Sequence, residues 1–472
     1  MRIAATCCAL AVSFFSASIG WAAPPNVLGL YPAGLSRGQT TVVTASGTIP
    51  DWPVQLKADR PGLSFECDKE KGKIKVTVAA DAAPGVYWVR VFNDDGAAMP
   101  RPLIVGSVRE IEEVEPNDAP DKPQLLDGPA TINGRIGKAG DVDSYAIRLT
   151  AGQKIVASLQ ANNLLNSPMD GVIQFAQLEG YVAPSNSAAP AGNAPASAAG
   201  GGAQPAAAAA PVNSGPTAAN PLARRPEAFV LAQKDDETGL DPRLVATAPR
   251  DGYYLVRVFA FPSETNANVS FAGGDNYVYR LTITTQPFLD FALPLAISKA
   301  NPSPLHLRGW NLPEALATLP APAPRDGEQD WAAAERALFS VARAEAAGGM
   351  ELPWTDFPTV IADATASPEK PQIVAWPVSI SGVIEEPRDV DAFQVTATKG
   401  QKLRLKVDAR SLGFPLDPVV QVLDATGKSL VELDDANNQR DVETVFTVPA
   451  DGAYRVAVRD IHQHGGERYA YR

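Results

Sequence analysis

The chain has 472 residues, the length of about three ordinary domains. Hydrophobic residues make up 45% and charged residues 20%, so packed cores can form, while 42 prolines and 37 glycines disfavour long helices. The 41 basic and 53 acidic residues give a net charge of -12, which repels phosphate backbones and excludes nucleic acid as a natural partner. Three histidines and three cysteines leave little material for a His-based catalytic site or a Cys/His zinc site.

The N-terminus has the layout of a secretory signal peptide over residues 1–23. Met1 and Arg2 give a positive start, an apolar stretch runs from Ala4 to Ile19, and small residues follow before Pro24. The stretch is too short, and too closely followed by a cleavage site, for a membrane anchor. We therefore expect an exported protein without a membrane span, either secreted, periplasmic or held at the cell surface.

Residues 26–106 show the pattern of a β-sandwich. Lys73–Val78 alternates polar and apolar residues, and Val86–Phe92 is a β-branched and aromatic run closed by turn residues. The size of the segment fits an immunoglobulin-like domain. Its opening and the stretch 83–87 resemble the Ig-like, TIG-type modules of bacterial surface proteins, a resemblance that assigns no site.

An internal repeat is the most informative feature of the sequence. The runs Ile132–Ile136, Gly140–Tyr145 and Ala151–Lys154 recur, with matched spacing, as Ile380–Ile384, Arg388–Phe393 and Lys399–Lys402. Strand-like runs alternate with Asp/Gly turns in both copies, which predicts tandem antiparallel β-sandwich or jelly-roll domains in an all-β protein. The first copy continues past Arg280 whereas the second ends at Arg472, so we expect the second to be C-terminally truncated by at least one strand.

The repeated segment resembles a known family. The acidic leader Glu113–Asp118, followed by the turn Gly140–Tyr145 and the step Gly152–Gln153, resembles the bacterial pre-peptidase C-terminal (PPC) domain. The resemblance covers residues 107–285 and 361–472. The family is a β-sandwich found beside secreted peptidases and is related to the collagen-binding domain of clostridial collagenases. Ig-like modules joined to several such domains are common in planctomycete exported proteins, and the resemblance implies binding and anchoring rather than bond cleavage.

Calcium is the sharpest chemical hypothesis, because this cation takes six to eight oxygen ligands from carboxylates and carbonyls. Glu113, Glu115 and Asn117 alternate and would share one face of an extended leader. The resemblance implies that Asp118, Asp141 and Asp143 supply further oxygens. The alternative is structural: the leader caps a linker, and the aspartates close tight turns.

The second copy departs from this pattern. Aligning Pro123 with Pro371 sets Ile361, Asp363, Thr365 and Ala366 opposite the four leader residues. Asp389 and Asp391 remain, but three of the four leader ligands are lost. We therefore expect calcium in the first PPC-like domain alone.

Two further segments interrupt the β pattern. Residues 184–226 are nearly all Ala, Pro, Gly, Ser and Asn, a composition that predicts a disordered insertion in the first copy. Residues 286–360 form a connector in which Leu305–Leu312 looks like the remnant of a short β-module. Within it, the run from Asp330 to Arg343 has a helical period and predicts a helix over 330–344.

Motifs of catalysis are missing from the sequence: it contains no Gly-x-Ser-x-Gly elbow, His-Glu-x-x-His helix or phosphate-binding glycine loop. His462 and His464 suggest a transition-metal pair or, more simply, a polar hairpin loop, and Asp434–Asp435 has the context of a turn. We therefore interpret the chain as a noncatalytic binding or scaffolding protein.

The ligand in this interpretation is an extracellular polymer, either a protein fibre or a polysaccharide, or a partner surface protein. Tyr253, Tyr277 and Tyr279 are candidate contacts, although strand alternation favours packing roles for them. The alternative is an accessory region of a secreted peptidase whose catalytic domain lies outside the chain.

Overall fold

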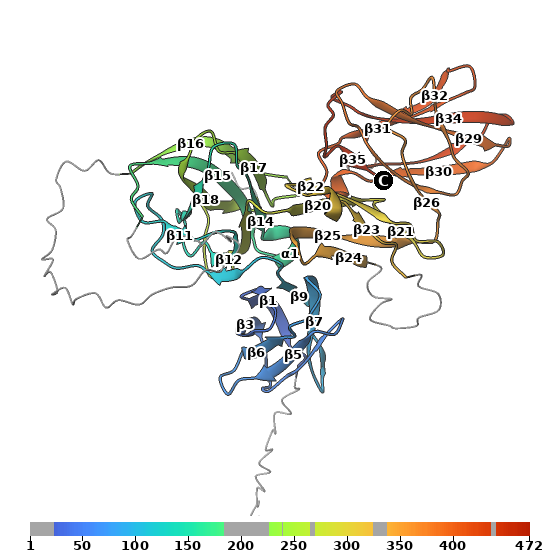
Figure 1. The fold of residues 1–472 in the computed structure, drawn as a ribbon. Coiled ribbons are helices and arrows are strands. Elements are labelled where there is room, and N and C mark those ends of the chain that lie inside the picture. Colours follow the sequence, from blue (N-terminus) through green and yellow to red (C-terminus); the bar gives the residue numbers. More distant parts are fainter. Residues whose placement is uncertain (1–22, 184–225, 238, 265–269, 324–337, 436–439) are drawn as a thin grey trace, which may run out of the picture.

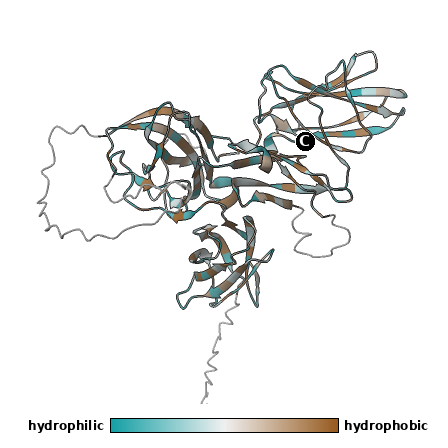
Figure 2. Ribbon diagram, viewed as in Figure 1, coloured by the Kyte–Doolittle hydropathy of each residue, from teal (hydrophilic) through white to brown (hydrophobic). Residues whose placement is uncertain are grey.

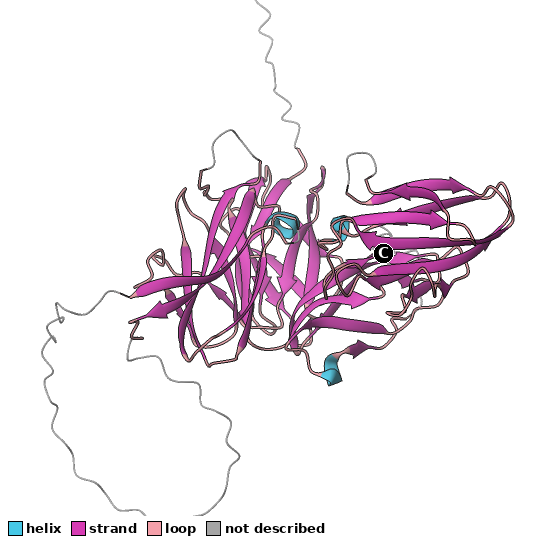
Figure 3. Ribbon diagram, turned by 90° about the horizontal axis from the view of Figure 1, so that it is seen from above, coloured by secondary structure: helices cyan, strands magenta, loops and turns pink. Residues whose placement is uncertain are grey.

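The computed structural model describes residues 23–183, 226–237, 239–264, 270–323, 338–435 and 440–472. The predicted signal peptide, apart from Ala23, and the predicted insertion, apart from Pro226, lie outside the described residues. The all-β prediction is confirmed, because the described chain consists of paired strands with one four-residue α-helix and two short 3-10 helices (Figure 3). No helix in the described ranges has the length and apolarity needed to cross a bilayer.

The first module is a two-sheet sandwich over residues 26–105. The sheets have the orders β1-β3-β6-β5 and β2-β9-β7-β4, with β8 paired to β7. Alternate residues of β6 and β7 point inward, and the core includes Val76, Tyr87 and Val89, all at most 1% exposed. The strands are β1 (Asn26–Tyr31), β2 (Gly34–Leu35), β3 (Thr40–Thr48), β4 (Gln55–Ala58), β5 (Leu63–Cys67), β6 (Lys73–Val78), β7 (Gly85–Asn93), β8 (Gly96–Ala97) and β9 (Arg101–Val105).

The second module, residues 110–284, packs two five-stranded sheets face to face. Their orders are β10-β12-β19-β14-β17 and β11-β13-β18-β15-β16. In both, a short leader strand adds in parallel to an otherwise antiparallel sheet. The elements are β10 (Glu110–Glu112), β11 (Gln124–Leu126), β12 (Ala130–Arg135), β13 (Asp143–Leu149), β14 (Lys154–Gln160), α1 (Asn162–Leu165), β15 (Met169–Glu179), β16 (Glu227–Lys234), β17 (Arg243–Thr247), β18 (Gly252–Pro262) and β19 (Val278–Thr284).

The fourth module, residues 359–471, repeats this strand order. It has the sheets β26-β28-β35 and β27-β29-β34-β31-β32 and the separate pair β30-β33. A tyrosine at the start of the long central strand donates to a carbonyl four residues back in both modules: Tyr254 to Arg250 at 2.7 Å and Tyr454 to Ala450 at 2.6 Å. The elements are β26 (Thr359–Ile361), β27 (Gln372–Ile373), β28 (Ser379–Val383), β29 (Val390–Ala397), β30 (Lys402–Val407), η2 (Arg410–Leu412), β31 (Pro418–Leu423), β32 (Ser429–Leu433), β33 (Val442–Thr447), β34 (Gly452–Asp460) and β35 (Ala470–Tyr471).

The stretch that we predicted to be a connector folds as a third module, residues 288–355, with one six-stranded sheet. Its order is β21-β25-β20-β22-β23, and β24 pairs with β25. The elements are β20 (Phe288–Leu293), β21 (Ile297–Ser298), β22 (Leu305–Trp310), η1 (Glu314–Leu316), β23 (Thr318–Leu319), β24 (Leu338–Arg343) and β25 (Ala346–Thr355).

The predicted helix over 330–344 is wrong for residues 338–343, which form strand β24. Residues 330–337 lie outside the described residues. The hairpin with β25 buries Val341 completely and stacks Phe339 edge-on against Trp354, at 6.0 Å between ring centroids. The helical periodicity does not decide the conformation here. As a strand, residues 338–343 satisfy the backbone hydrogen bonds of β25 and bury their apolar side chains at the same time.

Buried charges connect the second, third and fourth modules, which lie in a row in Figure 1. Asp290 on β20 accepts hydrogen bonds from Arg243 of the second module and from Arg468 of the fourth, where Nε lies 2.6 Å from Oδ2. Arg468 also pairs with Glu237 of the second module. We call these four residues the charge junction, and it fixes the three modules to one another.

Hydropathy follows the sandwich pattern throughout. In Figure 2 the hydrophobic residues concentrate in the strands, and the connecting loops are mostly hydrophilic.

The first module joins the second through Asn133, whose Oδ1 accepts from the backbone N of Gly34 at 2.7 Å and whose Nδ2 donates to Glu110 at 2.9 Å. Glu110 in turn pairs with the buried Arg280. The acidic leader therefore begins at an interface between two modules.

Candidate metal site

The acidic leader runs beside the second module directly after β10. The backbone N of Glu113 donates to the carbonyl of Asn133 at 3.1 Å, which extends the parallel pairing of β10 with β12 by one residue. Beyond it, the backbone N of Asn117 donates to Glu115 Oε2 at 2.9 Å and closes a turn. The leader thus presents its acidic side chains from a fixed backbone.

The turn between β12 and β13 supplies two more carboxylates. Asp141 Oδ2 accepts from the backbone N of Gly137 at 2.6 Å, and the backbone N of Asp141 donates to the carbonyl of Lys138. Two residues later Asp143 opens β13. Asp141 and Asp143 are 3% and 0% exposed, so the fold buries both carboxylates beside the leader.

Leader and turn together form a carboxylate cluster. Each of Glu115, Asp118, Asp141 and Asp143 offers one oxygen, and the four oxygens lie within 4.8 Å of one another. The structure therefore brings together four of the six residues that the sequence predicted as ligands. No other group of three or more such side chains comes together among the described residues.

Three buried oxygens at this place have no hydrogen-bond partner within the described part of the chain: Asn117 Oδ1, Asp141 Oδ1 and Asp143 Oδ1. Asn117 is 1% exposed, and its Nδ2 donates to Glu113, which leaves the amide oxygen for another ligand. Leaving buried acceptors unsatisfied costs about 1–3 kcal/mol each, more for charged groups. A cation bound by these oxygens would offset that cost.

The electrostatics of the cluster also favour a bound cation. Burial, together with the charge of Glu113, raises the pKa of Asp143 to about 10. Burial and the neighbouring Asp118 raise the pKa of Asp141, and burial raises that of Glu115. Lys138 Nζ lies 3.8 Å from both Asp118 and Asp141 and is largely exposed. One exposed ammonium compensates these carboxylates weakly, since water screens it.

Glu113 has a different place from the one we expected. Its carboxylate turns into the module and accepts from the hydroxyls of Tyr145 and Tyr279, both at 3.1 Å, and from the backbone N of Arg135 at 2.8 Å. It therefore anchors the leader and orients Asn117, outside the group of four. Sequence reasoning missed the two tyrosines as positioning residues. The run Tyr277–Arg280 recurs in the second copy as Tyr469–Arg472, and this repetition was the signal for Tyr279.

The candidate aromatic contacts serve mainly as packing. Tyr279 is 1% exposed and hydrogen-bonds to Asp143, so it cannot contact an external polymer. Tyr277 packs against the core of the second module. Tyr253 contacts Tyr181 edge-on at 5.2 Å on the outer face of its sheet.

The fourth module shows what the site becomes without its leader ligands. Its backbone pairing puts Ala362, not Ile361, at the position of Glu113, because the N of Ala362 donates to the carbonyl of Ser381 as Glu113 does to that of Asn133. The alignment was therefore displaced by one residue there, and neither residue offers a carboxylate. Asp391 is buried and accepts from the hydroxyl of Tyr471, and burial raises its pKa to about 7.

The two histidines occupy a loop after β34. Their ring centroids lie 5.8 Å apart, and Asp460 Oδ2 accepts from the backbone N of both His462 and His464, at 2.9 and 3.0 Å. These bonds define a loop held by Asp460. They belong to no group of three close metal-binding side chains among the described residues.

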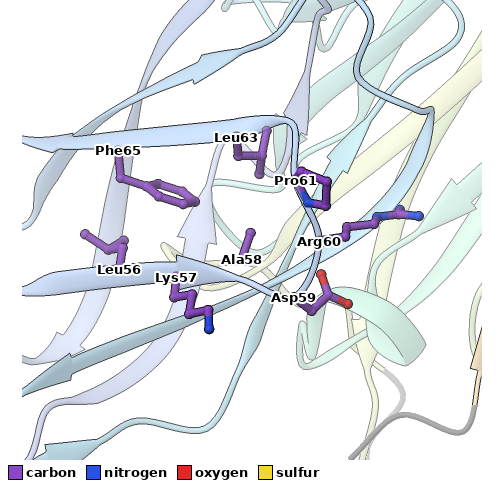
Figure 4. A pocket seen from close by; sticks show the side chains of 8 residues that line it. All are labelled: Leu56, Lys57, Ala58, Asp59, Arg60, Pro61, Leu63 and Phe65. Carbon is purple, nitrogen blue, oxygen red and sulfur yellow. The ribbon is translucent and has the colours of Figure 1, made fainter. Parts of the chain in front are cut away.

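A pocket of about 390 Å³ lies on the first module between the edge strands β4 and β5 (Figure 4). Leu56, Leu63 and Phe65 form its apolar lining. The polar groups on its rim already have structural partners: Asp59 accepts from the backbone N of Trp88, and Arg60 donates to the carbonyl of Val86 and covers the ring of Tyr87. The chemistry of a ligand site is therefore concentrated at the carboxylate cluster.

Residues 389–460, which run from the start of β29 to the end of β34, match the bacterial pre-peptidase C-terminal domain family. A 95-residue stretch is 38% identical to a probable subtilase-type serine protease of Deinococcus radiodurans; the alignment spans 20% of this chain and 13% of that protein.

Two solved structures show distant similarity. The surface-associated copper-binding protein CorA of Methylomicrobium album BG8 has 15% identity and a TM-score of 0.20, with 34% of this chain and 96% of that chain covered. The protein SGBP-B of a Bacteroides ovatus mixed-linkage glucan utilization locus has 10% identity and a TM-score of 0.16, with 90% and 74% covered.

Proposed function

We propose that the chain is an exported, noncatalytic binding and scaffolding protein of the cell surface or periplasm, in which calcium stabilises the second module. The observation that carries the calcium proposal is the set of buried, unsatisfied oxygens of Asn117, Asp141 and Asp143 beside the carboxylates of Glu115 and Asp118. Four carboxylates and an amide oxygen are a hard donor set. Zinc prefers His and Cys ligands, which the cluster lacks.

Calcium bound there would act on the joint between the first two modules. Glu113 precedes the ligands in the leader and lies near Tyr31 of the first module. Burial, together with the charge of Glu113, raises the pKa of Tyr31 to about 12. The ring of Tyr31 lies under the guanidinium of Arg135, 4.7 Å from the ring centroid, and its hydroxyl donates to the carbonyl of Asn133 at 3.1 Å. A cation that orders the leader would therefore also order this interface.

The test is isothermal calorimetry of the purified chain with calcium, magnesium and zinc. We expect one calcium site with a dissociation constant on the order of 0.1–1 mM, the range of extracellular calcium modules. Asp141→Asn should abolish the binding heat, and Asp389→Asn, its counterpart in the fourth module, should leave it unchanged. Absence of calcium heat at millimolar concentrations, or equal loss in both variants, would contradict the proposal.

A second candidate function has support from the comparisons. The match to a pre-peptidase domain family and the similarity to a subtilase-type protease favour an accessory region that anchors a peptidase to its substrate. The experiment adds the purified chain to a subtilisin-type protease acting on insoluble protein. An increase in product release, absent with soluble casein, would favour this function over scaffolding alone.

A further inference from the structure

An aromatic cluster lies on the second module outside its core. Phe259 and Phe261, two residues apart on β18, point to the same face of the sheet, and Phe271 joins them. The centroids of Phe261 and Phe271 are stacked at 5.4 Å, and Phe259 meets both edge-on, at 6.0 and 5.6 Å. We call these three rings the aromatic patch.

The patch lies on the solvent side of the sandwich. The core of the module takes Tyr254, Val256, Val258 and Ala260 from β18, which are the alternate residues of that strand. None of the three phenylalanines belongs to this core, and Phe271 is 47% exposed. The other sheet, with β14 and β17, contacts the third module, where Val156 and Val245 pack near Phe288, whereas β18 and the patch belong to the sheet without this contact.

The patch is held rigidly. β18 pairs with β13 up to Val258 and with β15 as far as Pro262, and the backbone N of Ala272 donates to the carbonyl of Ala260 at 2.9 Å. Phe271 is thereby fixed beside the strand that carries the other two rings. A rigid aromatic surface loses little side-chain freedom when a ligand stacks on it.

Polar side chains of both signs border the rings on the same face. Asp170 stands opposite Phe261 in the ladder between β15 and β18. Gln174 accepts from Arg257 Nη1 at 3.3 Å and donates to Gln233 at 2.8 Å. Burial, together with the charges of the nearby Asp236 and Asp235, raises the pKa of Asp170 to about 6. The border of the patch therefore carries carboxylates, an amide and one guanidinium.

This combination selects a ligand class. The carboxylates of Asp170, Asp235 and Asp236 would repel an anionic polymer, and the guanidinium of Arg257 would oppose a cationic peptide. Sugar hydroxyls both donate and accept hydrogen bonds, and the apolar faces of sugar rings can stack on aromatic rings. A neutral polysaccharide therefore satisfies the rings, the carboxylate and the arginine at once.

We propose that the aromatic patch, with Asp170, Gln174 and Arg257, is a binding site for a neutral polysaccharide. The inference rests on the proposed binding function, because it names the ligand class and the face. Since the ligand is uncharged, binding should change little between 0.05 and 0.5 M salt, whereas binding of a charged polymer would weaken.

The experiment is affinity electrophoresis of the full chain in gels containing β-glucan, xylan or glucomannan, with pull-downs on cellulose, chitin and fibrous collagen. We expect retardation by at least one neutral polysaccharide. Phe271→Ala and Arg257→Ala should each weaken it about tenfold, and Phe271→Tyr should restore it. Phe357→Ala is the matched control, because Phe357 is also 47% exposed but lies outside the second module. Thermal melts confirm that the variants are folded.

Each outcome of these experiments overturns a different part of the proposal. Polysaccharide binding that persists in Phe271→Ala and Arg257→Ala overturns this site but leaves the binding function intact. Binding to collagen without binding to any polysaccharide overturns the ligand class alone. No binding to any of these polymers removes both this inference and the polymer-binding part of the proposed function.

Discussion

Removal of calcium should loosen the leader more than any other part of the chain. The perturbation is chelation, or Asp141→Asn, which takes one oxygen donor from the group of four. With a dissociation constant of about 0.1 mM, 10 mM calcium stabilises the folded module by about 2.7 kcal/mol. For a module of this size that corresponds to a rise on the order of 10 °C in its melting temperature.

Hydrogen exchange read by mass spectrometry is the suitable assay, because the described residues form four modules and a single melting curve would mix them. Peptides that cover 113–118 and the start of β13 should exchange about a hundredfold more slowly with 10 mM calcium, the equivalent of 2.7 kcal/mol. Peptides of β29 in the fourth module should not change. Equal protection of both modules, or protection that survives in Asp141→Asn, would refute the assignment of the site to the leader.

Three further predictions concern buried polar groups. Tyr279→Phe removes the hydroxyl that lies within hydrogen-bond distance of both Glu113 and Asp143. It should destabilise the second module by about 1–3 kcal/mol and weaken calcium binding in calorimetry, whereas Tyr471→Phe should leave calcium binding unchanged. The pKa of Asp391, about 7 in the folded state, lies above its value in the unfolded chain. Its protonation therefore stabilises the fourth module fully below about pH 4, and this stabilisation, about 3–4 kcal/mol, is lost as the pH rises through 7. The free energy of urea unfolding of Asp391→Asn should lack this dependence on pH, and an unchanged dependence would exclude Asp391 as its source. Asp290→Asn leaves Arg243 and Arg468 without their shared carboxylate and should lower the free energy of urea unfolding by about 3–5 kcal/mol. The control Asp356→Asn removes an exposed ion pair with Lys299 and should lower it by less than about 1 kcal/mol. Similar losses in the two variants would show that the charge junction does not hold the modules together.

Local patterns in the sequence predicted the sheets and most of the carboxylate cluster. The repeated turn 140–145 fixed where Asp141 and Asp143 stand relative to β13, and the leader had to run beside that strand for its carboxylates to matter. Alternation alone, however, put Glu113 with Glu115 and Asn117. The backbone bond from Glu113 to Asn133 and the buried hydroxyls of two distant tyrosines turn its carboxylate inward, and these are contacts across the fold.

Other features depended on pairing that no local pattern contains. The run Leu338–Arg343 carries a helical period, yet the partner strand β25 decides its conformation. The ladder between β26 and β28 puts Ala362 at the position of Glu113, which sequence alignment gave to Ile361. The charge junction joins residues from three modules, and sequence reasoning named none of the four.

The charge junction also has a mechanical consequence. Because Asp290 receives one arginine from each side, a pull applied to either end of the row reaches the next module through the same carboxylate. Its side chain is almost fully shielded from water, so dissolved ions weaken this coupling far less than they weaken contacts on the outside. The three modules should therefore behave as a stiff unit that transmits tension without bending, at low and at high ionic strength alike.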